Sequence, residues 1–162
     1  SLSIFPGAMV LTALMDLFTM TIPNRISLLL VAGFFALAPF VGLSAEQIMW
    51  HAATGAAMLA LGFLMFWRGW IGGGDAKIFS AIALWLGFAQ LGQFVGYAAV
   101  AGGLLTVFLL GFRRIPLPLM LTRVDWVMRL HNQQTGVPYG IALAVAALMI
   151  YPSTPWMTVA AF

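Results

Sequence analysis

The chain alternates between long apolar runs and short polar joints. None of the runs shows the strict alternation of apolar and polar residues that the strands of a membrane barrel require. Most of them approach the ~20 residues that a helix needs to cross a bilayer, although the fourth and the sixth are shorter. The pattern predicts six membrane-spanning helices, with a turn at 90–93 between the fourth and the fifth. Their approximate ranges are 2–20, 26–43, 48–67, 78–90, 94–112 and 137–151.

Composition narrows the class of protein further. Of the 162 residues, 63% are hydrophobic and only 7% are charged, against a usual charged share near ~25%. A soluble core of this length cannot bury so much apolar surface, so the surrounding solvent must be lipid. We therefore expect a single all-α integral membrane domain over residues 1–162, built as a bundle of six transmembrane helices. The sequence contains no cysteine, which excludes disulfides and thiolate chemistry.

The charges on the joints predict the orientation in the membrane. In a six-span arrangement every Lys and Arg falls on joints that share one side, and a count of five or seven spans would destroy this sorting. The positive-inside rule makes that side cytoplasmic and places both termini in the periplasm. Because these residues are scattered among the joints, they do not predict nucleic-acid binding. They are Arg25, Arg68, Lys77, Arg113, Arg114, Arg123 and Arg129.

The longest joint, residues 113–136, is expected to form a cytoplasmic or interfacial segment. After two prolines, residues 119–130 place apolar side chains along one side of a helix, with Trp126 available at headgroup depth. This pattern suits a helix lying on the inner leaflet, and a connecting helix packed on the bundle fits it equally well. Four other aromatic residues are expected at the membrane interfaces: Trp67, Trp70, Tyr151 and Trp156.

Two acidic residues adjoin the apolar runs. Asp16 lies in the first run, and Asp75 opens the fourth. A carboxylate at membrane depth is costly unless it is protonated, paired or wet, so intramembrane acids are functional candidates. An odd-numbered span ends on the side where an even-numbered span begins, and both acids are therefore expected near the cytoplasmic boundary. Two alternatives remain open: Asp75 as a helix cap after glycine, and Asp16 in a structural ion pair with Arg25 or Lys77.

The local surroundings of the two acids differ. Asp75 follows three glycines, which let the backbone bend and approach closely, and a helix start favours a negative charge. Asp16 has apolar neighbours, and burial among them disfavours the negatively charged form of its carboxyl group. An aspartic protease needs one base and one acid, so we expect Asp75 to activate water and Asp16 to donate a proton. The other acids and the histidines are expected to be solvated, salt-bridged or too distant: Glu46, His51, Asp125 and His131.

Three sequence elements resemble a known family. The string Gly72-Gly73-Gly74-Asp75-Ala76-Lys77 resembles the GxGD signature of type IV prepilin peptidases, which are aspartyl proteases of the bacterial inner membrane. Asp16 with Ile22-Pro23-Asn24-Arg25 resembles the other family aspartate and its downstream element, and Val137-Pro138-Tyr139-Gly140 resembles the start of the last span. The resemblance covers essentially the whole chain. It implies that Asp16 and Asp75 are catalytic without metal or cofactor, and that the site is shaped by Gly72, Gly73, Gly74, Lys77, Pro23, Asn24, Pro138, Tyr139 and Gly140.

The resemblance also implies a class of substrate. This is a prepilin or pseudopilin in the lipid bilayer, cut on the cytoplasmic side after a basic leader, commonly following a Gly. Larger members of the family carry a cysteine-containing zinc insert after the first span and methylate the new N-terminus. Here only a few residues join the first two runs, which points to the short, peptidase-only type that serves Flp/Tad pili. A preflagellin peptidase, a proton-conducting subunit and a non-catalytic assembly component remain alternatives, and the oligomeric state is not predicted.

Overall fold

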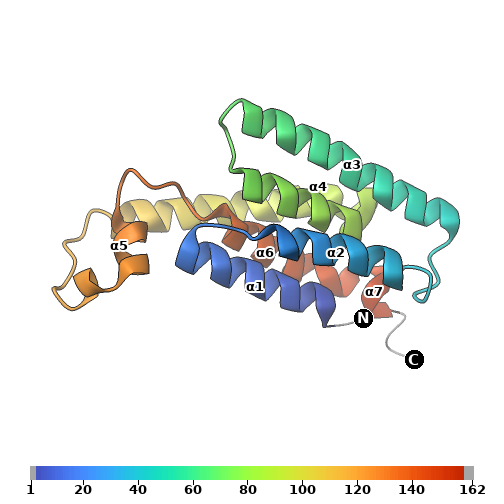
Figure 1. Ribbon diagram of the computed structural model, residues 1–162, viewed down its shortest axis with the longest axis horizontal. Helices are drawn as coiled ribbons and strands as arrows, with labels where there is room; N and C mark the ends of the chain where they lie inside the picture. The colour runs from blue at the N-terminus through green and yellow to red at the C-terminus, as the bar shows by residue number, and fades with distance from the viewer. Residues whose placement is uncertain (1–2, 159–162) are drawn as a thin grey trace.

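The computed structural model describes residues 3–158, and all regular structure in this range is helical (Figure 1). In chain order the elements are α1 (Ile4–Thr19), α2 (Asn24–Leu37), α3 (Ala45–Trp67), α4 (Gly73–Phe112), the 3₁₀ turn η1 (Leu121–Arg123), α5 (Asp125–His131), α6 (Tyr139–Ile150), the 3₁₀ turn η2 (Tyr151–Ser153) and α7 (Pro155–Thr158). By length and apolar composition, α3 and α4 are able to cross a membrane, while α1, α2 and the stretch Tyr139–Ser153 are apolar but shorter.

Helix α4 is interrupted at Gly87, where φ is 71° and ψ is 177°. This backbone conformation is essentially restricted to glycine. Beyond the break the chain turns back. The rings of Phe79, before the break, and Phe94, after it, stack with their centroids 5.5 Å apart, which shows the reversal. One continuous helix would separate these residues by ~22 Å. The two halves of α4 are thus antiparallel passes (Figure 1), and the predicted turn at 90–93 was wrong because the chain reverses earlier and 90–93 is helical.

The connections between helices sort to two ends of the bundle (Figure 1). The α1–α2, α3–α4 and α4–α6 connections lie at one end, on the left of the view, together with α5. Every Lys and Arg of the sequence lies in or beside these connections, and we call this the basic end. The α2–α3 connection and the reversal within α4 lie at the other end, which we call the opposite end.

Side chains close the opposite end around the break in α4. A helix that stops leaves the carbonyls of its last turn without intrahelical partners. The Leu84 carbonyl lies 2.8 Å from His51 Nδ1, which donates a hydrogen bond to it, and the Trp85 carbonyl accepts one from Trp156 Nε1 at 2.9 Å. The rings of Trp85 and Trp156 are buried with centroids 4.4 Å apart. The break at Gly87 is therefore satisfied and packed from within the protein.

Two aromatic residues expected at the membrane interfaces lie in this core instead. Trp156 is 1% exposed, and Tyr151 is 3% exposed and stacks on Phe5 with ring centroids 4.7 Å apart. Trp67 and Trp70 are exposed, as the interfacial assignment requires. The assignment failed for the first pair because hydropathy does not distinguish an aromatic ring that faces lipid headgroups from one that turns inward to cover a helix break.

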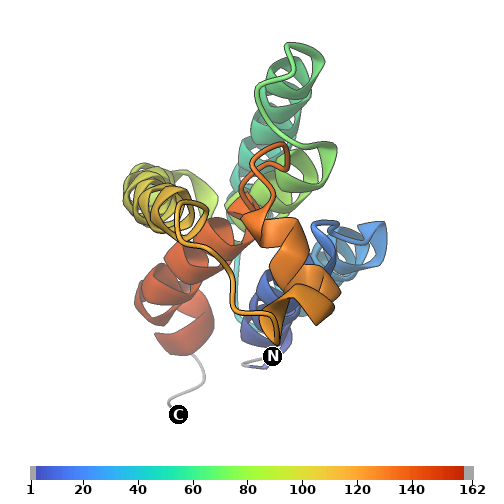
Figure 2. The same cartoon turned by 90° about the vertical axis from the view of Figure 1, so that its left-hand side faces the viewer.

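The 113–136 connection packs against the bundle. The helix predicted over 119–130 was too long, because only Leu121–Arg123 and Asp125–His131 are helical there. Arg129 Nη1 donates a hydrogen bond to the Phe18 carbonyl at 2.7 Å, and Trp126 contacts the Phe18 ring edge-on. Helix α5 therefore lies across the end of α1, as the view onto the basic end shows (Figure 2). These contacts fit a connecting helix packed on the bundle, and the placement of α5 on the inner leaflet stays a prediction.

Candidate functional site

Asp16 is buried near the end of α1, with 5% of its surface exposed. Its Oδ2 accepts a hydrogen bond from the backbone N–H of Gly140 at 2.7 Å. Gly140 lies in the first turn of α6, where backbone N–H groups have no partner inside the helix. A β-carbon at position 140 would lie 2.7 Å from Asp16 Oδ2, so the contact requires glycine. The carboxyl group on α1 thus caps the start of α6.

Asp75 lies in the first turn of α4 and is partly buried. Its carboxyl group turns back to the backbone of Gly72, the residue that precedes the helix. A β-carbon on Gly72 would lie 3.0 Å from Asp75 Oδ2. An acidic side chain at the third helical position commonly reaches back to the N-cap in this way. The helix-cap alternative is therefore part of the structure, with the acid at the third position of the helix and not at the cap itself.

Neighbouring side chains press on the glycines that precede Asp75. A β-carbon on Gly73 would lie 3.3 Å from the Phe66 ring, and one on Gly74 would lie 3.2 Å from Ile22 Cβ. Neither glycine has a positive φ. The expectation that this run serves backbone bending was wrong, because ordinary helical and extended conformations are used throughout. Glycine is needed here for space.

Ile22 connects the surroundings of the two acids. Its Cβ packs against Gly74 at the start of α4, and its Cδ1 would lie 2.8 Å from a β-carbon on Gly140 at the start of α6. The carboxyl groups of Asp16 and Asp75 are near enough to repel each other when both are charged. The structure therefore brings these two residues together at the basic end, where Ile22 packs between the starts of α4 and α6.

Lys77 takes part in a different contact. Its Nζ donates a hydrogen bond to Asn24 Oδ1 at 2.9 Å, which ties the start of α4 to the start of α2. Pro23 is the N-cap of α2. The ion pair considered for Asp16 is not what holds these groups, since Lys77 has this neutral amide as its partner and Asp16 has the Gly140 N–H. The Pro23–Asn24 element therefore positions helix ends around the acids.

The element that opens α6 contributes a wall of the site. Pro138 is the buried N-cap of α6, and Tyr139 follows it. The Tyr139 ring packs on Gly102 of α4, where a β-carbon would come within 2.8 Å of it. Tyr139 also lines a hollow that contains Asp75, between α3, α4 and α6. Adjacent residues of one helix start thus contact the surroundings of both acids.

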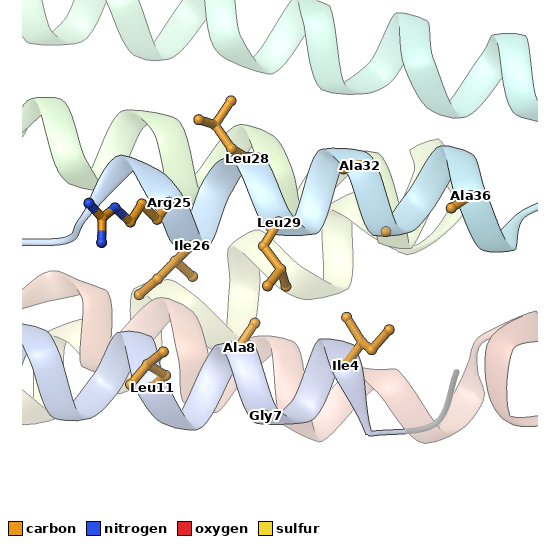
Figure 3. Close-up of a pocket in the computed structure, with 11 residues that line it drawn as sticks. Ile4, Gly7, Ala8, Leu11, Arg25, Ile26, Leu28, Leu29, Ala32 and Ala36 are labelled. Atoms are coloured by element: carbon orange, nitrogen blue, oxygen red, sulfur yellow. The ribbon is translucent and has the colours of Figure 1, made fainter.

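A larger hollow lies away from the acids. This groove of about 820 Å³ runs between α1 and α2 and has almost entirely apolar walls (Figure 3). A β-carbon added at Gly7 would meet nothing within 4 Å, so the groove is open there. Arg25 is the charged residue of its lining. Among the described residues, the lining of this groove contains no carboxyl group or histidine, so it is not the candidate site.

Sequence reasoning did not single out Ile22, Phe79 or Leu143 as separate site residues. Phe79 lies one helical turn beyond Asp75, and Leu143 lies one turn beyond Tyr139. This spacing of four residues places each on the same helix face as a candidate site residue, so the spacing alone could have predicted them as part of the site. Ile22 belongs to the element Ile22-Pro23-Asn24-Arg25, but that element does not reveal its contacts, which come from helices far away in the sequence.

Two neighbouring carboxyl groups, of which Asp75 lines an apolar hollow, can divide the work of proton transfer. One accepts a proton from water while the other donates a proton, which is the division of roles in aspartic proteases. The described residues therefore form an all-helical, strongly apolar protein with two helices long enough to cross a membrane and two acids close together at one end.

The family comparison agrees with this class. A family model described as the type IV leader peptidase family matches residues 3–107, and the chain belongs to this family. The matched range contains both acids and ends before α6. The searches of curated proteins and of solved structures returned no match.

Proposed function

We propose that this chain is an aspartic endopeptidase that removes the leader from prepilins and pseudopilins of the Flp type. Membership of the type IV leader peptidase family supports the reaction class. The observation that carries the proposal is the meeting of Asp16 and Asp75 at one end of an apolar bundle. Intramembrane acids are expensive, and two of them at one place are most simply explained by acid–base chemistry.

The proposed location is the bacterial inner membrane, with six spans and the site at the cytoplasmic boundary. The six spans are α1, α2, α3, the two antiparallel halves of α4, and α6 with η2. The gathering of all Lys and Arg residues at the end that holds the two acids supports a cytoplasmic site through the positive-inside rule. This orientation places both termini in the periplasm.

In the proposed mechanism Asp75 acts as the base and Asp16 as the acid. Asp75 accepts a proton from a water molecule, whose oxygen attacks the carbonyl carbon of the scissile peptide bond. The tetrahedral intermediate then collapses, the carbon–nitrogen bond breaks, and Asp16 supplies the proton that the leaving amine takes. No covalent intermediate with the protein forms. The hollow beside Asp75 supports this assignment, since it gives that residue the room that water and substrate require.

The enzyme is proposed to lack N-methyltransferase activity. The connection between α1, which ends at Thr19, and α2, which begins at Asn24, leaves no space for an inserted domain. The sequence also has no cysteine to bind zinc in such an insert. The cleaved pilin is therefore expected to carry an unmodified N-terminus, which mass spectrometry of the product measures directly.

Coexpression with a Flp-type prepilin tests the proposal. Leader removal is followed by gel mobility and by mass spectrometry of the product, with Asp16→Asn and Asp75→Asn as the test variants. Asp125→Asn is the matched control, because this exposed acid begins α5 and lies outside the site. The two test variants should accumulate at the normal level and leave the prepilin uncut, while the control cleaves it. Normal processing by either test variant would show that the pair is not catalytic, and a preflagellin offered in parallel separates the two substrate classes.

A further inference from the structure

A hollow of about 170 Å³ opens beside Asp75, between α3, α4 and α6. Asp75 and Tyr139 lie at the starts of α4 and α6, and therefore at the basic end of this hollow. Phe79 and Leu143, one helical turn further along the same two helices, also line it. A turn of this length rises ~6 Å. The hollow thus has polar groups at its rim and apolar side chains below them.

The walls of this hollow are set by helix packing. Gly62 and Met65 of α3 and Ile71 complete the lining. At Gly62 a β-carbon would lie 3.1 Å from Ala76 Cβ, so α3 and α4 are already in contact along this edge. Phe79 is held by the stacked ring of the returning half of α4. The space is therefore bounded mainly by packed helices, and among the described residues that line it Ile71 of the α3–α4 connection is the one outside them.

The size and polarity of the hollow restrict what can occupy it. An apolar cavity of ~150 Å³ in an unrelated protein accommodates benzene, so about 170 Å³ is enough for a leucine or phenylalanine side chain. A carboxylate side chain buried against such walls would lose its hydration without gaining a partner, because the acidic residue of the lining is Asp75. A larger indole ring would have to displace lining side chains such as Met65 of α3 or Leu143 of α6.

Building on the proposed function, we propose that this hollow is a specificity pocket for the substrate. It receives an apolar side chain no larger than a phenyl group from a residue that flanks the scissile bond, and Met65 and Leu143 set its size. A side chain seated in the pocket places its own backbone at the rim, beside Asp75, where the attacking water is activated. The pocket therefore selects the side chain and positions the peptide bond in one step.

The test uses the full-length protein and a set of prepilins changed at one position. The residue on each side of the scissile bond is replaced in turn by Ala, Leu, Phe, Trp or Asp, and kcat/KM is measured for each substrate. The wild-type enzyme should prefer Leu or Phe over Ala, Trp and Asp by roughly tenfold or more at one of the two positions, which is the usual discrimination of an apolar pocket.

Variants of the pocket should then shift this order. Leu143→Ala should raise cleavage of the Trp substrate relative to the Leu substrate by roughly tenfold, and Leu143→Phe should shift the preference toward Ala by a similar factor. Met65→Ala enlarges the pocket from its α3 side and should likewise raise cleavage of the Trp substrate relative to the Leu substrate. Val145→Ala and Val145→Phe are the matched controls, since this residue lies on α6 with 42% of its surface exposed, and they should keep the wild-type order.

The outcomes separate the pocket from the reaction. If the wild-type enzyme cleaves prepilin but the order of substrates stays the same in the Leu143 and Met65 variants, the pocket is not where the side chain binds. Equal cleavage of the Asp and Leu substrates at both positions would overturn it as well. If the wild-type enzyme cuts neither the set nor the unmodified prepilin, the proposed function itself fails.

Discussion

The basic end and the opposite end of this bundle use similar parts and reach different results. At both ends a glycine is pressed against a side chain, and a helix terminus presents backbone groups without helical partners. At the opposite end the ring N–H groups of His51 and Trp156 close the terminus, and an aromatic core fills the space around it. At the basic end an acid, Asp16, closes the terminus of α6, and a hollow remains beside Asp75.

The difference between the two ends assigns them different roles: the opposite end stabilises the fold, and the basic end carries the groups able to react. A ring N–H that donates to a carbonyl within a filled core contributes stability. A buried acid beside an empty space costs stability and makes proton transfer possible. Substitutions at the basic end are therefore expected to change the rate of cleavage more than the stability, and substitutions at the opposite end are expected to do the reverse.

The largest effect is expected from removing the acids. Asp16→Asn and Asp75→Asn preserve shape, and Asn at position 16 can still accept the Gly140 N–H through its amide oxygen. Each variant should lower the cleavage rate by roughly 10²–10⁴-fold or more, the range associated with a lost general acid or base. The melting temperature in detergent micelles should stay close to that of the wild type. Unfolding of either variant would break the comparison, because the basic end would then be needed for stability.

Gly87→Ala should act on stability. The replacement forces a side chain into a conformation essentially reserved for glycine and places its β-carbon 2.7 Å from the His51 ring. We expect a loss of about 3 kcal/mol in the free energy of unfolding, since strain of this kind alone costs ~1–3 kcal/mol. Gly96→Ala, also in α4 and open to space, is the control and should be neutral or stabilising by up to ~1 kcal/mol. Equal stability of the two variants would show that the break in α4 is not held as described.

Gly140→Ala should act on activity. Its β-carbon would meet Asp16 Oδ2 at 2.7 Å and Ile22 Cδ1 at 2.8 Å, so the carboxyl group must move. A displacement near 1 Å at a catalytic group costs roughly 10²-fold in rate. Gly136→Ala lies before α6 with nothing within 4 Å of the added carbon and should cleave at the wild-type rate. Measured initial rates that do not differ between these variants would show that the position of Asp16 is unimportant.

The smallest effect is expected at His51. Replacement by Ala removes the donor to the Leu84 carbonyl and should destabilise the fold by about 1–2 kcal/mol, the cost of leaving a buried acceptor unsatisfied. His51→Asn keeps an N–H donor near the position of Nδ1 and should recover part of this loss. Cleavage per folded molecule should be unchanged in both variants, as measured by rates normalised to folded protein. A drop in that rate would show that the two ends are coupled.

The features predicted well from the sequence are those that depend on where apolar and charged residues occur along the chain. The apolar runs correspond to helices, and the charged joints lie at one end, so span parity alone brought Asp16 and Asp75 to the same end. The position of the reversal could not be predicted in the same way. The 78–112 stretch is apolar almost throughout, and the polar residues at 90–93 were a stronger local signal than the single glycine that breaks the helix.

The finer structure of the site could not be predicted because it rests on contacts between distant segments. The hydrogen bond from Gly140 to Asp16 joins α6 to α1, and the side chains packed against Gly73 and Gly74 are those of Phe66 and Ile22. In each case the sequence shows that a glycine is present but not which neighbour excludes a larger residue. Pairing across the bundle is decided by packing, and a linear pattern does not contain it.

The position of Ile22 has a consequence for how this site changes over time. Ile22 is a hydrocarbon side chain packed between the starts of α4 and α6, the two helices that carry Asp75 and the partner of Asp16. Valine at the same position would remove one methyl group, and leucine would keep the volume but change the shape. The packing of these two helix starts can therefore change while every polar residue stays as it is.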